Sequence, residues 1–176
     1  MEQLVKRAKK GDKEAFITLM EGQTETLKRV AYAWLNNEED IADVIQDTIL
    51  DAYEHIGQLK KAAYFRTWIV RILINNCTRI YRKNKKHAKF EISADGHESG
   101  KEWLYGVRGE TDAGHADLEF SDLLRALPED SRVIFQMYFG EQFTTAEIAG
   151  MLHMKENTVK SRIHRGKEKL RRQIDQ

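Results

Sequence analysis

The apolar positions recur at helical spacing, three and four residues apart, along most of the chain. In the first part of the chain they predict one helix, which Asp12 is suited to cap. The apolar residues of this helix are Phe16, Leu19, Met20, Leu27, Val30 and Ala31. Asn36-Asn37 interrupts the pattern. No segment shows the convincing two-residue alternation of a strand, and we therefore predict an all-α fold.

The next segment, DIADVIQDTILDAYEHI, predicts a helix with two different faces that ends at Gly57. With residues placed 100° apart, one side carries Ile41, Val44, Ile45, Thr48, Ile49, Ala52 and Ile56. Another side carries Asp40, Asp43, Asp47 and Asp51. A further helix, from about residue 65 to residue 82, has on its core side Phe65, Trp68, Ile69, Ile72, Leu73 and Ile80. Cys77 lies in this helix, and we interpret it as a packing residue because a free cysteine behaves as a small buried hydrophobe.

Helical periodicity fails from about residue 87 to residue 116. The segment FEISADGHESGKEWLYGVRGETDAGHA is acidic and rich in glycine, which predicts a flexible linker. Within it, Trp103, Leu104 and Tyr105 form a candidate docking motif. We therefore predict two small helical domains, residues 1–86 and 117–176, joined by the acidic linker 87–116. Its ~30 residues could extend to at most ~100 Å.

The second domain carries signals for the ends of its helices. Pro128 suits the first turn of a helix, and Gly140 suits its C-terminal end. Thr144 with Glu147 predicts a capping box that opens the short helix TTAEIAGML. A brief turn then leads into TVKSRIHRGKEKLRR. This is the spacing of a helix-turn-helix motif.

Charge is strongly segregated along a chain whose formal net charge is only +1. Charged residues are all acidic from 38 to 54, all basic from 60 to 89, mainly acidic from 90 to 120, and mainly basic from Lys160 onward. This alternation indicates more than one partner surface. No apolar run approaches the ~20 residues of a membrane-spanning helix, and no secretory signal opens the chain, so we expect a cytoplasmic protein.

The basic C-terminal helix has one apolar and one cationic face. Its apolar face carries Val159, Ile163, Gly166, Leu170 and Ile174. Its opposite face carries Lys160, Ser161, His164, Arg165, Glu168, Arg171 and Arg172. Arginine and lysine pair with guanine edges in the major groove or hold phosphates, so this face suits DNA. A solvated basic helix would show the same pattern, and the helix by itself leaves that alternative open.

Two segments of the chain resemble one known family. ALPEDSRVIFQMYFGEQFTTAEIAGMLHMKENTVKSRIHRGKEKLRRQI resembles the promoter-reading C-terminal domain of extracytoplasmic-function (ECF) sigma factors. DIADVIQDTILDAYEHI followed by FRTWIVRILINNC resembles their N-terminal core domain. The two motifs occur in the order of the family and cover nearly the whole chain outside the linker. Lys155-Glu156-Asn157 stands where the family often has a small residue, so the start of the recognition helix is not defined by the motif.

The resemblance implies a sigma factor that directs core RNA polymerase to promoters. It places on a coiled coil in the clamp of the largest polymerase subunit Asp43, Gln46, Asp47 and Leu50. It places on the non-template strand of the minus-ten element Arg71, Asn75, Asn76, Thr78, Arg79 and Arg82, with Asn75 as the candidate base reader. It places on the minus-thirty-five element Lys160, Ser161, His164, Arg165, Arg171 and Arg172. It also implies a membrane-associated anti-sigma factor as a partner, without insertion of this chain into the membrane.

Two other classes of function remain to be compared with this one. The acidic helix face of Asp40, Asp43, Asp47 and Asp51 could belong to a metal-dependent nuclease, but carboxylates on one helix face seldom converge on one ion without ligands from a second element. We therefore expect no catalytic residue, metal or cofactor. A helix-turn-helix regulator that binds duplex DNA without polymerase is the second alternative. Such a regulator binds DNA alone, whereas a sigma factor binds core polymerase.

Overall fold

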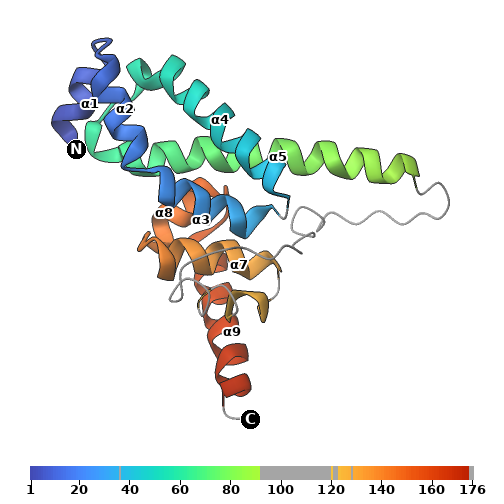
Figure 1. Cartoon of the computed structure of the whole chain (residues 1–176). Coiled ribbons are helices and arrows are strands. Elements are labelled where there is room, and N and C mark those ends of the chain that lie inside the picture. The colour runs from blue at the N-terminus through green and yellow to red at the C-terminus, as the bar shows by residue number, and fades with distance from the viewer. Residues whose placement is uncertain (36, 92–119, 121–122, 128, 175–176) are drawn as a thin grey trace. The chain divides into compact units, whose positions relative to one another are not determined.

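The computed structural model describes residues 1–35, 37–91, 120, 123–127 and 129–174, and the side chains within these ranges except at 84–91, 129–130 and 173–174. In these ranges the regular structure is helical, without strands, as the periodicity predicts (Figure 1). The chain divides into two compact units, Met1–Glu98 and Ser99–Gln176. Most of the predicted linker lies outside the described residues. Within the described ranges, none of the helices combines the length and hydropathy that a membrane crossing requires.

The first unit begins with three short helices, α1 (Glu2–Ala8), α2 (Lys13–Glu21) and α3 (Thr24–Trp34). Asp12 caps α2, as predicted, by accepting a hydrogen bond from the backbone N–H of Ala15. The single helix predicted here is wrong, because the chain breaks at Gly22 and starts again at Thr24. Glycine favours such a break, and the Thr24 hydroxyl bonds the carbonyl oxygen of Met20 at the end of α2.

Two longer helices complete the first unit. α4 (Glu38–His55) packs against α5 (Phe65–Glu91), and two 3-10 turns, Ile56–Gln58 and Ala62–Tyr64, connect them. The predicted apolar side of α4 faces the core: buried on it are Ile41, Val44, Thr48 and Ala52. On α5 the buried residues include Phe65, Ile69, Val70, Leu73, Ile74 and Cys77, so the packing role expected of the cysteine is confirmed. Burial raises the pKa of the Cys77 thiol.

α5 continues past the domain end predicted at residue 86, up to Glu91. The sequence KNKKHAKFE lacks an apolar stripe but contains residues of good helix propensity and neither glycine nor proline. Propensity therefore extends this helix beyond the point where apolar periodicity ends.

The second unit contains α7 (Glu129–Phe135), a π-helical turn (Gln136–Gly140), α8 (Thr145–Met151) and α9 (Glu156–Ile174). Pro128 lies outside the described residues, and Gly140 lies one residue before the cap of the π-helical turn. The buried core includes Leu127, Ile134, Met137, Ile148, Met151 and Val159. α9 packs against both α7 and α8. Gly166 allows the close approach to α7, because a Cβ at this position would collide with the ring of Phe135.

Candidate polymerase and nucleic-acid interfaces

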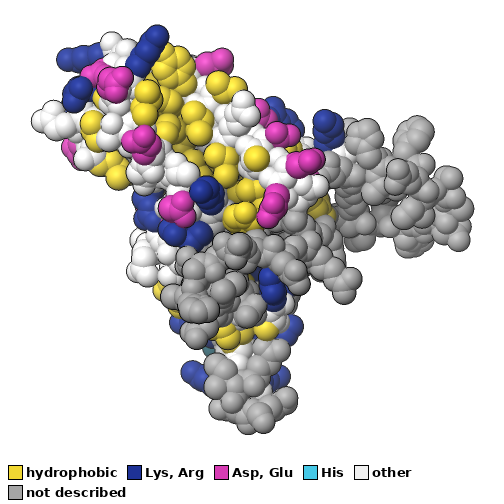
Figure 2. All heavy atoms as spheres, viewed as in Figure 1, with side chains coloured by type: hydrophobic (Ala, Val, Ile, Leu, Met, Phe, Trp, Pro, Cys, Tyr) yellow, Lys and Arg dark blue, Asp and Glu magenta, His cyan; other side chains and the backbone are white. Residues whose placement is uncertain are grey.

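The outer face of α4 carries the four residues predicted to contact polymerase. Asn37 caps this helix, its side-chain oxygen accepting from the backbone N–H groups of Glu39 and Asp40. Asp43 and Gln46 are exposed. The Asp47 side chain is 44% exposed, and Leu50 is 55% exposed. Figure 2 shows acidic and apolar side chains side by side on this unit, a mixture typical of a protein interface rather than of a plain solvated face.

Polar side chains join α4 to α5 where the two predicted surfaces meet. Nη2 of Arg79 donates to Oδ2 of Asp47 over 2.7 Å. Arg79 is predicted to contact DNA, and Asp47 is predicted to contact polymerase. Asn76 donates from Nδ2 to Oδ2 of Asp51 over 2.9 Å and to Oγ1 of Thr48 over 3.3 Å. Asn76 is only 5% exposed. Asn76 therefore lies in the contact between α4 and α5 and is not presented to a DNA strand. The sequence pattern predicts this residue at the edge of the DNA-binding face.

The remaining predicted minus-ten residues lie along one side of α5. Arg71, Asn75 and Arg82 are exposed. Thr78 is half-buried, and its hydroxyl donates to the carbonyl oxygen of Ile74 over 2.8 Å. Their spacing of three and four residues puts their side chains in one row on the helix. The row is cationic and amide-bearing, which suits a single strand whose bases and phosphates are both accessible.

An exposed aromatic residue before α5 was missed by the sequence analysis. Tyr64 is 57% exposed, and the Nζ atom of Lys61 lies 5.7 Å from the centre of its ring. The loop that holds it is anchored by Lys9, whose Nζ donates to the carbonyl oxygen of Leu59 over 2.6 Å. Aromatic rings with adjacent cations stack unpaired bases. The segment QLKKAAYF contains the signal, a tyrosine three and four residues after two lysines, but the exposure of the tyrosine depends on the fold.

α8 and α9 form the predicted helix-turn-helix. The Thr144 and Glu147 capping box is present, with both reciprocal hydrogen bonds. His153, with φ 52°, makes the turn before α9 begins at Glu156. All the residues predicted to contact the minus-thirty-five element are exposed: Lys160, Ser161, His164, Arg165, Arg171 and Arg172. Val159, Ile163 and Gly166 are buried on the other side, as predicted.

Two acidic residues on α9 pair with predicted DNA-contacting residues. Lys160 Nζ lies 2.9 Å from Oε1 of Glu156, and His164 Nε2 lies 3.7 Å from Oε1 of Glu168. Glu156 also accepts from the hydroxyl of Thr145, at the start of α8, over 2.7 Å. The hydrogen bonds from Lys160 and Thr145 hold the pKa of Glu156 below its ordinary value. Glu156 is therefore a fixed anion at the beginning of the cationic face.

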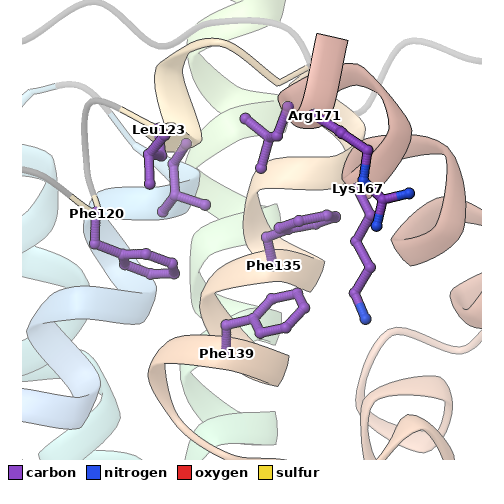
Figure 3. A pocket seen from close by; sticks show the side chains of 8 residues that line it. Phe120, Leu123, Phe135, Phe139, Lys167 and Arg171 are labelled. Atoms are coloured by element: carbon purple, nitrogen blue, oxygen red, sulfur yellow. The ribbon is translucent and has the colours of Figure 1, made fainter. Parts of the chain in front are cut away.

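An apolar groove opens in the second unit between α7, α9 and the preceding residues (Figure 3). It has a volume of about 400 Å³. Its lining residues are Phe120, Leu123, Leu124, Phe135, Phe139, Lys167, Leu170 and Arg171. Lys167 Nζ lies 5.2 Å from the centre of the Phe139 ring. The groove is thus apolar with cations at its edge, and Arg171 contributes to it as well as to the exposed face of α9.

The described residues contain no group of three or more His, Cys, Asp or Glu side chains arranged to hold a metal ion. The four aspartates of α4 do not form such a group, and two of them bond α5 instead.

Family models match both units of the chain. The model of Sigma-70 region 2 matches residues 19–87, and that of Sigma-70, region 4 matches residues 117–170. The chain is 28% identical to the ECF RNA polymerase sigma factor SigW of Bacillus subtilis (strain 168), over 97% of this chain and 94% of that protein. It is 25% identical to the RNA polymerase sigma-H factor of Pseudomonas aeruginosa, over 95% of this chain and 90% of that protein.

Solved structures show the same fold. CnrH in complex with the cytosolic domain of CnrY matches with a TM-score of 0.67 and 23% identity, over 99% of this chain and 96% of that one. The sigma factor RpoE in complex with the anti-sigma factor NepR, from Bartonella quintana, matches with a TM-score of 0.67 and 19% identity, over 94% of this chain and 98% of that one. Because regions 2 and 4 occur in order along one chain whose relatives align over nearly its full length, the protein belongs to the extracytoplasmic-function (ECF) sigma factors of the sigma-70 family.

Proposed function

We propose that this chain binds core RNA polymerase and directs it to specific promoters. The observation that carries the proposal is the presence of both sigma-70 regions in one chain, each with a charged face that its core leaves exposed. A helix-turn-helix regulator acting alone needs only the second unit for DNA binding. In that alternative the first unit would bind a ligand or a partner other than polymerase, whereas the match to Sigma-70 region 2 supports polymerase as the partner.

The α4 face is the polymerase contact in this proposal. Asp43, Gln46 and Asp47 bring negative charge and hydrogen-bonding groups, and Leu50 supplies an apolar anchor among them. Charged groups around an apolar centre give fast, oriented association, and the desolvated centre holds the complex. The partner surface is the coiled coil in the clamp of the largest polymerase subunit, which the family resemblance implies.

The α5 face binds the non-template strand of the minus-ten element. Asn75 offers both a donor and an acceptor for the edge of an unpaired base. The cations of this face, Arg71, Arg79 and Arg82, hold the phosphates, and Thr78 lies beside them. Tyr64 with Lys61 supplies a stacking surface at the start of the same helix. Asn76 is excluded from this set because its amide is committed to α4.

The α9 face enters the major groove of the minus-thirty-five element. Recognition helices read base edges mainly with the residues of their N-terminal half. Lys160, Ser161, His164 and Arg165 occupy that half, and Arg171 and Arg172 lie further along and contact phosphates. The residues that read base edges and the residues that bind phosphates thus lie in different parts of one helix.

The protein works in the cytoplasm, catalyses no reaction of its own and uses no cofactor. Its activity is regulated by an anti-sigma factor associated with the membrane. The solved structures of similar folds support this proposal, because CnrH is bound to the cytosolic domain of CnrY and RpoE to the anti-sigma factor NepR.

Reconstituted transcription tests the proposed function. Core RNA polymerase is supplied with genomic DNA fragments, with and without the purified chain, and the 5′ ends of the RNA are sequenced. We expect a set of start sites that appears only with the chain and that shares two upstream sequence elements. A chain that binds duplex DNA by itself but neither binds core polymerase nor changes the start sites would instead be a helix-turn-helix regulator.

A further inference from the structure

Glu156 contacts a residue of α8 and a residue of α9 through one carboxylate oxygen. Its Oε1 atom accepts from Oγ1 of Thr145 over 2.7 Å and lies 2.9 Å from Nζ of Lys160. Thr145 belongs to the first turn of α8, whereas Glu156 and Lys160 lie one turn apart on α9. Thr145 of α8 thus holds the Glu156 carboxylate, and this carboxylate in turn holds Lys160 on the groove-facing side of α9.

A negative charge beside the cationic face of α9 disfavours binding to every DNA sequence, because DNA phosphates repel it. Its contribution is therefore to selectivity rather than to affinity. Lysine has a long flexible side chain and three donors, and without a partner its ammonium group readily binds a phosphate. A fixed carboxylate beside it restricts the ammonium group and balances its charge.

We propose that Glu156 is a positioning residue that makes Lys160 a reader of base edges instead of a phosphate contact. One donor of the ammonium group is directed at Glu156, and the other two are left for the O6 and N7 acceptors of a guanine. The Thr145 hydroxyl fixes the carboxylate, so the direction of Lys160 is set by the α8–α9 geometry. This inference rests on the proposed binding of α9 to the minus-thirty-five element.

An exposed pair of this kind is weak in water, but it gains strength when the DNA excludes solvent from the interface.

The pair of Glu168 with His164 differs in two respects. Its atoms are 3.7 Å apart, and its histidine is charged only when protonated. Glu168 therefore provides a matched control: an exposed glutamate on the same helix, also four residues from a predicted DNA-contacting residue.

The experiment uses the full chain bound to core polymerase and a library of promoter duplexes with a randomised minus-thirty-five element, at two salt concentrations. The variants are Glu156→Gln, Lys160→Ala, their combination, Thr145→Val and Glu168→Gln. We expect Glu156→Gln and Lys160→Ala to relax preference at the same base pair by about tenfold. The combination should relax it no further, and Glu168→Gln should leave that base pair unaffected.

The dependence on salt gives a second, independent readout. Glu156→Gln releases the Lys160 ammonium group to a phosphate, so the slope of log affinity against log salt should steepen by about 0.9, whereas Lys160→Ala should not steepen it. Thr145→Val removes only the tether and should relax the same base pair in part.

Several results would overturn the inference. If Glu156→Gln relaxes a base pair different from that of Lys160→Ala, the carboxylate reads DNA itself, and if it relaxes none, it has no role in reading. If Glu156→Gln fails to fold, Thr145→Val replaces it in the test. An unchanged base preference in Thr145→Val would then show that Glu156 has no role in reading. A wild-type holoenzyme that selects no upstream sequence at all would instead refute the proposed function, and the inference with it.

Discussion

Asn75 and Asn76 are adjacent in the chain and have opposite environments. Asn75 is exposed on α5, whereas Asn76 is buried and bonded to Asp51 and Thr48 of α4. Helical spacing predicts both near the DNA, because a rotation of 100° between neighbours leaves the second at the edge of the face. Only one of them remains a candidate DNA contact, and the other is a structural link between two helices.

Alanine substitution should separate these two roles. Asn76→Ala removes the donor that the buried hydroxyl of Thr48 and the half-buried carboxylate of Asp51 share, so we expect a loss of about 1–3 kcal/mol in the free energy of unfolding. Asn75→Ala should change stability by less than about 0.5 kcal/mol and weaken holoenzyme binding to a single-stranded minus-ten oligonucleotide. Urea unfolding followed by circular dichroism, together with fluorescence anisotropy, measures both. Equal effects of the two variants on either quantity would contradict this assignment.

Asp47 takes part in the exposed α4 face and in the ion pair with Arg79. We expect Asp47→Lys to reduce the affinity for core polymerase several-fold, since it reverses charge on the proposed interface. The fold should survive, because the ion pair is exposed and such pairs contribute little to stability. The measurement is a quantitative pull-down of core polymerase.

The double variant Asp47→Lys, Arg79→Glu is the control for this prediction. It restores opposite charges across α4 and α5 but keeps the reversed charge at position 47. Affinity should therefore remain low. Recovery in the double variant would show that the ion pair, and not the α4 surface, is responsible.

Arg165 and Arg172 test the division between reading and holding on α9. Arg165→Ala should cost ~1–3 kcal/mol at the preferred element and relax preference at one base pair. Arg172→Ala should weaken binding to all sequences alike and reduce the salt slope by about one unit. Holoenzyme binding to randomised upstream elements at two salt concentrations distinguishes them. If both variants weaken all sequences equally, α9 is an electrostatic anchor, and promoter choice rests on α5 or on DNA shape.

At the scale of elements, the position of α9 depends on the glycine that faces α7. A Cβ at Gly166 would collide with the Phe135 ring and press on Leu127, so Gly166→Ala must displace α9 or rearrange the core. Gly150 on α8 has an exposed position, and a Cβ there would meet no atom within 4 Å. The two glycines therefore differ in what surrounds them, although both lie within helices.

We expect opposite effects from alanine at these two glycines. Gly166→Ala should destabilise the second unit by about 1–3 kcal/mol through overpacking. Gly150→Ala should be neutral or stabilise it by up to about 1 kcal/mol, because alanine has the higher helix propensity. Thermal unfolding of the two variants beside the wild type provides the comparison. Equal stability of Gly166→Ala and the wild type would mean that the α7–α9 contact is adaptable.

At the scale of the whole molecule, the charged helices are distributed over the two units. The first unit carries the acidic α4 and the basic α5, and the second carries the basic α9. Each unit has its own buried core. A protein built in this way can use separate surfaces for polymerase and for two DNA elements.

Limited proteolysis tests this division. The glycine-rich sequence between residues 92 and 116 predicts the first cleavage there. Because α5 extends to Glu91, the expected site lies beyond the domain boundary that the sequence predicts at residue 86. Mass spectrometry should detect two resistant fragments. A first cut between Asp12 and Tyr53 would show that the first unit is not a stable domain.

Periodicity and local signals in the sequence were sufficient for the helical class, the two-domain order and the faces of the long helices. The Asp12 cap, the Thr144 capping box and the burial of Val159 and Ile163 agree with those signals. Such features depend on residues within a few positions of one another, so the chain can be read locally. The break at Gly22 and the extension of α5 show the limit of this reading, because there weak local preferences compete.

Contacts between distant segments could not be read in the same way. Asn76 bonds residues 25 and 28 positions away, and Arg79 pairs with a residue 32 positions away. Glu156 bonds Thr145 across the turn between α8 and α9. Helical spacing places each side chain on a face, but the crossing of two helices selects which faces meet and in what register. The packing of the two cores makes that choice. It makes Asn76 a structural link between α4 and α5, and it joins Glu156 to Thr145 of α8.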